Sequence, residues 1–376
     1  MSEKKAYLPA PGSLTDLILL FVALCGEFPT SLINRLPGSE AYKVIVVNRL
    51  KEKNMIYTYF RDSLRGLRLT AAARSTLLLL QPERYSNILS GNSLVNTPKY
   101  DVRTRLRLHR MAEVLVMMYH VGYEVLPWEK PGVFLPDEQF TPLSVTKPAY
   151  YSSHEVKRIG EQGNTIRNSR ATGVLLAPDR IFAVFNTADG EMKWDYDTEL
   201  RLKNFLRQDV CYTRFSDQYG YVTPEAFIVS QGMEQFPGLF RETKKGKKPF
   251  VRGIQFEHVH YLTMDHRGEV LLQILCSPQL RYLLDSALTC VLAPPRDYLI
   301  ENDGFDSDGA PVLLGYSCDI PRIHKFYEGL LIHDLTGTIF CFDFQKDTLR
   351  EICSDKVHFE DIDFDEYERS LFHIPP

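Results

Sequence analysis

The densest set of side chains that could contact nucleic acid lies between Ser39 and Leu69. Ser39 is a good helix N-cap, and Val46 and Leu50 follow at the spacing of a buried helix face. The opposite face carries residue types that bind phosphates and base edges. We predict that this helix contacts DNA through Ser39, Tyr42, Lys43, Asn48 and Arg49.

A two-stranded hairpin is predicted directly after this helix. Residues 56–60 and 66–69 are apolar or alternate in polarity, and the short turn between them is basic. Such a wing would lie on DNA phosphates, through Arg61, Arg65 and Arg68. The alternative is a small α+β lobe whose helix face is only solvated.

More arginines begin the helix predicted over residues 102–122. Cations at a helix N-terminus oppose the helix dipole, which favours an anionic partner for them. We therefore extend the predicted DNA contact to Arg103, Arg105 and Arg107; a solvated helix face is an equal alternative.

Glu113, Glu191 and Lys193 are the candidates for metal-dependent chemistry. In a strand, Glu191 and Lys193 would share one face. A carboxylate that holds Mg²⁺ and a lysine that acts on the attacking water need this arrangement. A Glu-x-Lys tripeptide is common by chance, however, and Glu113 alone is an ordinary helical glutamate.

Histidines and cysteines give no metal-binding pattern. His258 and His260 share a strand face and His266 follows, but no third ligand stands at a recognisable spacing. The seven cysteines are scattered, without a CxxC pair. We predict no metal site, no cofactor and no disulfide framework.

These residues need two structural units to position them. Predicted helices at 14–25, 30–36 and 39–53, followed by the hairpin, give a winged helix over residues 13–80. Residues 81–99 are rich in Ser, Asn, Pro and Gly and predict a linker. The remainder, 100–376, mixes helices with strands, so the fold class is α+β. Its predicted strands include 153–157, 270–275, 312–317, 329–335 and 338–344, before an acidic end.

Charge separates the same two units. The 376-residue chain has a net charge of −4, but residues 1–110 hold 17 Lys and Arg against 8 Asp and Glu, a charge of +9. The rest therefore carries −13. A basic lobe on an acidic body favours a nucleic-acid contact at the front. The apolar run at 17–24 is too short to span a membrane, so we expect a cytoplasmic protein without membrane contact.

Two segments resemble the plasmid replication–relaxation family, which pairs a winged helix with a restriction-endonuclease-like body. Arg107–Pro127 (RLHRMAEVLVMMYHVGYEVLP) resembles the first helix and strand of its second domain, and residues 170–206 resemble the central hairpin and helix. The resemblance covers roughly residues 13–290. It implies a DNA-binding protein of a bacterial plasmid or integrative element.

The chain departs from the nuclease pattern where metal ligands should stand. Ala171-Thr172 replaces Pro-Asp before Gly173, and Phe185 replaces the Glu of the second strand. Neither Ala nor Phe can bind a metal, so the body is predicted to be inactive and to serve assembly. Its expected partners are a second copy of the chain or a replication or transfer protein, beside double-stranded DNA.

Two other functions stay open from the sequence. The protein could regulate transcription of the element's own genes. It could also be a metal-dependent nicking nuclease that uses Glu113 with Glu191 and Lys193.

Overall fold

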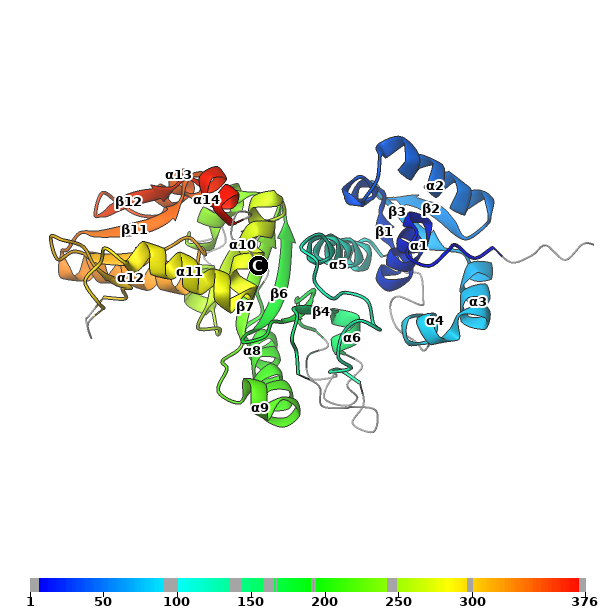
Figure 1. Ribbon diagram of the computed structural model, residues 1–376, viewed down its shortest axis with the longest axis horizontal. Coiled ribbons are helices and arrows are strands. Elements are labelled where there is room, and N and C mark those ends of the chain that lie inside the picture. The colour runs from blue at the N-terminus through cyan, green and yellow to red at the C-terminus, as the bar shows by residue number, and fades with distance from the viewer. Residues whose placement is uncertain are drawn as a thin grey trace, which may run out of the picture.

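The structure is a computed structural model, and it describes residues 7–90, 101–135, 144–157, 166, 168–190, 192, 194–241, 249–295 and 300–371. The chain forms an N-terminal lobe, residues 7–90, and a larger body, residues 101–371 (Figure 1). Helices and three sheets mix throughout, so the α+β prediction is confirmed. Within these ranges no helix has both the length and the apolar character needed to cross a membrane.

The lobe begins with three helical segments and a hairpin, as predicted. Its elements are α1 (Leu14–Cys25), β1 (Phe28–Pro29), η1 (Thr30–Arg35), α2 (Glu40–Glu52), β2 (Ile56–Arg61) and β3 (Leu64–Leu69). The second segment, η1, is a 3₁₀ helix. The strands form an antiparallel sheet in the order β1-β3-β2. Asp62 and Ser63 join β2 to β3 with φ of 53° and 60°, as a two-residue hairpin turn requires.

The predicted linker 81–99 is wrong in its first half. α3 (Ala71–Leu80) is followed at once by α4 (Pro82–Leu89). Pro82 stands in the first turn of α4, where the missing N–H costs nothing. Tyr85 and Ile88 are buried in the lobe core, which explains why this polar segment is helical. Residues 91–99 lie outside the described residues.

The body begins with α5 (Val102–His120), which packs between the lobe and a five-stranded sheet (Figure 1). The strand order is β4-β5-β6-β7-β8, antiparallel up to β6 and parallel from there on. The strands are β4 (Ala149–Ser152), β5 (Gly173–Leu176), β6 (Ile181–Ala188), β7 (Glu225–Ser230) and β8 (Val259–Thr263). Along the chain, α5 therefore comes first, followed by β4, β5 and β6, and β7 and β8 come last.

Several shorter segments connect and cover this sheet. They are α6 (Ser153–Val156), α8 (Tyr196–Phe205), a π-helical stretch η3 (Leu206–Arg214), α9 (Ser216–Tyr219), η4 (Met233–Leu239), η5 (Phe250–Gly253), α10 (His266–Cys276) and α11 (Pro278–Thr289). The predicted strand at 153–157 is therefore wrong: Ser152 caps a single helical turn, and the strand ends before it.

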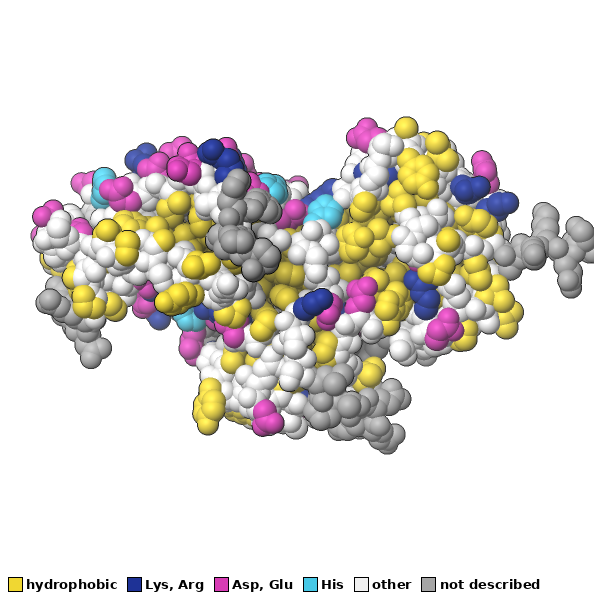
Figure 2. All heavy atoms as spheres, viewed as in Figure 1, with side chains coloured by type: hydrophobic (Ala, Val, Ile, Leu, Met, Phe, Trp, Pro, Cys, Tyr) yellow, Lys and Arg dark blue, Asp and Glu magenta, His cyan; other side chains and the backbone are white. Residues whose placement is uncertain are grey.

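A second sheet follows, in the order β12-β11-β10-β9. β10 (Pro311–Leu314), β11 (Gly337–Phe342) and β12 (Val357–Ile362) are parallel, with β9 (Gly304–Phe305) antiparallel at the edge. The crossovers are α12 (Ile320–His333) and α13 (Asp343–Arg350), and α14 (Phe364–Leu371) ends the fold. Acidic side chains gather over β12, α13 and α14 on the face shown in Figure 2.

Two more predicted strands are wrong. Residues 270–275 belong to α10 and most of residues 329–335 to α12. Both are apolar runs, and periodicity alone cannot distinguish a buried helix from a buried strand.

One apolar core joins the lobe to the body. It runs from Phe21 and Phe28 of the lobe through Val114 of α5 to Phe182 and Phe227 on one face of the five-stranded sheet. The opposite face of this sheet shares a second core with the C-terminal sheet. The N-terminal lobe is thus packed firmly against α5, because α5 is buried along both sides.

Candidate nucleic-acid interface and nuclease-like centre

α2 presents a long exposed face. The Ser39 hydroxyl accepts a hydrogen bond from the Tyr42 amide at 3.4 Å, which confirms the predicted N-cap. Val46 and Leu50 are buried against the lobe. Ile45 is 61% exposed, so it belongs to the solvent-facing side of α2.

The predicted contacts on α2 divide into exposed and buried residues. Tyr42, Asn48 and Arg49 are exposed and share the solvent side of the helix with Ile45. Lys43 is a correction: it is 4% exposed, and its Nζ donates to the Asn34 carbonyl at 2.7 Å. Its ammonium group holds η1 against α2 and does not face solvent.

The wing keeps two of its three predicted arginines. Arg61 and Arg65 flank the turn and are exposed. Phe60 is 63% exposed, and the Arg65 guanidinium lies 5.5 Å from the centre of its ring. Arg61 also lies 3.4 Å from Asp62, an exposed pair that is worth little in water. Arg61 and Arg65 are therefore available to an external phosphate.

Arg68 and Arg105 are the main corrections to the predicted interface. Both are almost fully buried, and both bind the carboxylate of Glu27, which is also buried. Arg68 donates to Glu27 Oε2 at 2.6 Å and Arg105 to Oε1 at 2.7 Å, while His109 Nε2 lies 2.9 Å from Oε1. Arg105 also donates to the carbonyls of Arg61 and Leu64. We call these four side chains, Glu27, Arg68, Arg105 and His109, the Glu27 cluster.

The Glu27 cluster stabilises the ionised form of the Glu27 carboxylate. Burial alone would raise the pKa of Glu27, but hydrogen bonds from His109, Arg105 and Arg68 outweigh burial and lower this pKa to about 2. The Tyr59 ring lies 3.9 Å from the Arg68 guanidinium and 4.7 Å from that of Arg105. Because α5 supplies Arg105 and His109, the cluster links the wing to the first helix of the body.

The other two α5 arginines differ from each other. Arg103 is exposed. Arg107 is half-buried and donates to the Ser169 carbonyl at 2.7 Å, across the start of β5. Of the three predicted α5 contacts, only Arg103 faces solvent freely.

Some exposed residues of the lobe were missed as candidates. Val44 and Ile45 of α2 are 59% and 61% exposed, and Phe60 projects from the wing. Figure 2 shows apolar and basic side chains together over α2. The helical period could have found this stripe, because positions 44, 45, 48 and 49 lie opposite the buried positions 46 and 50.

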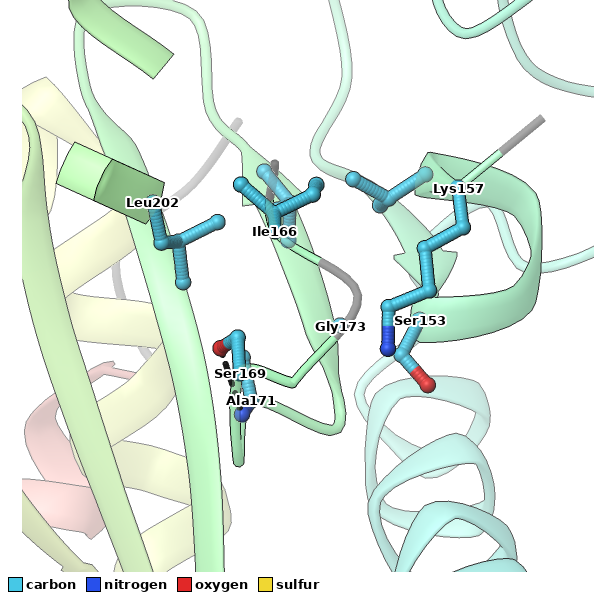
Figure 3. Close-up of a pocket in the computed structure, with 9 residues that line it drawn as sticks. Ser153, Lys157, Ile166, Ser169, Ala171, Gly173 and Leu202 are labelled. Carbon is cyan, nitrogen blue, oxygen red and sulfur yellow. Dashed lines mark hydrogen bonds between the residues drawn. The ribbon is translucent and has the colours of Figure 1, made fainter. Parts of the chain in front are cut away.

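Apolar side chains pack around Phe185, one of the positions where the resemblance would place a metal ligand. Phe185 is 1% exposed and packs on Trp194 and Phe256, with ring centres 5.0 Å and 6.4 Å away. Ala171 lines a small hollow beside Gly173 and Leu202 (Figure 3). The only polar contact drawn between its lining residues is the bond from the Ala171 amide to the Ser169 hydroxyl.

Glu113 of α5 faces this sheet from the other side. The Asn186 amide donates to Glu113 Oε2 at 2.8 Å and to the Arg110 carbonyl at 3.0 Å, so Asn186 faces α5. Phe185, its neighbour in β6, faces away. Burial raises the pKa of Glu113, although the bond from Asn186 opposes this shift. Glu113 and the Phe185 position therefore lie on opposite faces of the sheet.

Glu191 and Lys193 lie outside the described residues. Among the residues that are described, no group of three His, Cys, Asp or Glu side chains is arranged to hold a metal ion.

No family model, curated protein or solved structure matches this chain.

Proposed function

We propose that the protein binds double-stranded DNA, with α2 in the major groove and the β2–β3 wing on flanking phosphates. One observation carries the proposal. The exposed face of α2, with Tyr42, Asn48 and Arg49, lies on the same lobe as two arginines of the wing that make no buried bond. A helix and a basic hairpin used together are the contact elements of winged-helix proteins.

The side chains of α2 suit base readout. Arginine can bind guanine and asparagine can bind adenine, each through two hydrogen bonds. Val44 and Ile45 would meet thymine methyl groups, which are the apolar feature of the major groove. The exposed apolar residues are thus compatible with a groove-facing helix.

The body takes an assembly role in this proposal. Ala171-Thr172 and Phe185 stand where the resemblance would place Pro-Asp and Glu, so these positions supply no carboxylate. With the family resemblance, DNA binding would serve replication or transfer of a bacterial mobile element, and the body would contact a second copy or a replication or transfer protein.

Fluorescence anisotropy on a labelled duplex tests the proposal. We expect the full chain to bind, and a variant combining Arg49→Ala, Arg61→Ala and Arg65→Ala to lose about a hundredfold in affinity at moderate salt. Arg241→Ala is the matched control, because Arg241 is an exposed arginine of the body paired with Glu351.

Equal affinity of the triple variant and the wild type would overturn the proposal. Absence of binding to any duplex would do so as well.

A further inference from the structure

A polar cavity of about 230 Å³ lies where the two sheets of the body meet. β8 reaches this junction through a single bridge between His260 and Asp319, just before α12. The Tyr261 amide also donates to the Cys318 carbonyl. The walls carry three arginines from three different parts of the body: Arg180 before β6, Arg281 of α11 and Arg322 of α12.

The arginines have hydrogen-bonding capacity to spare. A guanidinium carries five N–H donors. Arg180 makes one bond, to Glu225 at 3.2 Å. Arg281 makes two, to the Leu275 carbonyl and to Asp179. Arg322 also makes two, to Glu301 and Asp303, so most donors of the three groups have no protein partner among the described residues.

Most carboxylate oxygens of the cavity already accept a hydrogen bond. Asp319 accepts from His258 at 2.7 Å through one oxygen and from the Val259 amide through the other. Asp303 accepts from Arg322 at 2.8 Å and, through its second oxygen, from the Leu314 amide at 2.7 Å. Asp285 accepts from the Tyr316 hydroxyl at 2.7 Å. The unused capacity of the walls is therefore mainly donor capacity.

Two histidines line the same wall. Their rings lie parallel, 7° apart in orientation and 6.3 Å between centres. His258 uses Nδ1 on Asp319, which leaves its Nε2 without a hydrogen bond to the described residues, and the side chain is 42% exposed. His260 is 4% exposed, bonds Glu225 through Nε2 at 2.9 Å and has no partner for its buried Nδ1. His266 is not part of this wall; it pairs with Glu368.

We propose that this cavity binds the phosphate group of a small phosphorylated molecule. Phosphate accepts hydrogen bonds through several oxygens, and arginine matches it in charge and geometry. A metal ion does not suit the site, because three arginines line it and no group of three His, Cys, Asp or Glu side chains in the described parts of the chain is arranged to hold a metal. This inference does not depend on DNA binding by the lobe.

Isothermal titration calorimetry of the full chain with inorganic phosphate tests the site. We expect saturable binding, and at least about a tenfold loss of affinity in Arg180→Ala, since a charge-assisted pair is removed. Arg180 is the suitable arginine because its side chain is 29% exposed and makes a single ion pair. Arg241→Ala, which removes an exposed arginine paired with Glu351, should bind phosphate like the wild type.

Three results would overturn the inference: no saturable binding of phosphate, equal binding by Arg180→Ala, or acetate binding as tightly as phosphate. Thermal unfolding of ligand-free Arg180→Ala should match the wild type and so separate a lost site from a lost fold. DNA affinity of Arg180→Ala should also be unchanged; a loss there would move Arg180 from a small-molecule site to the DNA interface.

Discussion

Two arginines of the lobe have the same side chain but differ in burial. Arg65 and Arg68 are three residues apart in β3, yet Arg65 is exposed at the wing and Arg68 is 1% exposed against Glu27. The difference shows that a basic segment can contain both an external contact and an internal support. Arg68 holds the wing to α5, and Arg65 is left for a partner.

The largest expected effect on stability comes from removing the buried counter-ion of Arg68. Glu27→Gln would leave two buried guanidinium groups without their counter-ion, and loss of one partner from a buried pair costs about 3–5 kcal/mol. Urea unfolding measures this loss. Glu52→Gln, an exposed change at the end of α2, should stay within about 0.5 kcal/mol of the wild type. A similarly small effect of Glu27→Gln would contradict the structural role of the cluster.

Acid should weaken the same cluster. The pKa of Glu27 falls from 4.5 to about 2 on folding, so its stabilisation is complete above pH 4.5 and is lost as the pH falls towards 2. At about 1.4 kcal/mol per pKa unit, the loss is about 3 kcal/mol. Unfolding free energies of the wild type and Glu27→Gln, measured across this range, should therefore converge as the pH falls. Parallel curves would show that Glu27 is not the titrating group.

Packing around the cluster gives a smaller effect. A Cβ added at Gly66 would come within 2.8 Å of Glu27 Cδ. Overpacking of this kind typically costs about 1–3 kcal/mol, which Gly66→Ala should show in urea unfolding. Gly253→Ala is the control, because no atom lies within 4 Å of an added Cβ there. If both variants unfold alike, Glu27 is less rigidly held than the structure indicates.

The sequence predicts local features of the lobe well. Ser39 and the apolar spacing behind it predict α2, and the alternation around residues 61–65 predicts the wing. The Glu27 cluster could not be predicted in this way, because its members are far apart in the sequence. Arg68 follows Glu27 by 41 positions and Arg105 follows it by 78. Nothing near Arg68 or Arg105 distinguishes them from exposed arginines.

The candidate sites of the body show the same limit. The sequence itself shows that Ala171-Thr172 and Phe185 supply no carboxylate. It does not show the orientation of Glu113, because this depends on which face of β6 packs against α5. The cavity beside His258 is lined by residues from β8, α11 and α12. The sequence does not predict α12, because residues 329–335, which include its C-terminal end, have the pattern of a strand.

The salt dependence of DNA binding tests the central claim most directly. Each phosphate contact contributes about 0.9 to the slope of log affinity against log salt concentration. The triple variant Arg49→Ala, Arg61→Ala, Arg65→Ala loses the two phosphate contacts of the wing, so its slope should be shallower than the wild type by about 1.8, while Arg241→Ala keeps the wild-type slope. Identical slopes for the triple variant and the wild type would contradict an interface formed by α2 and the wing.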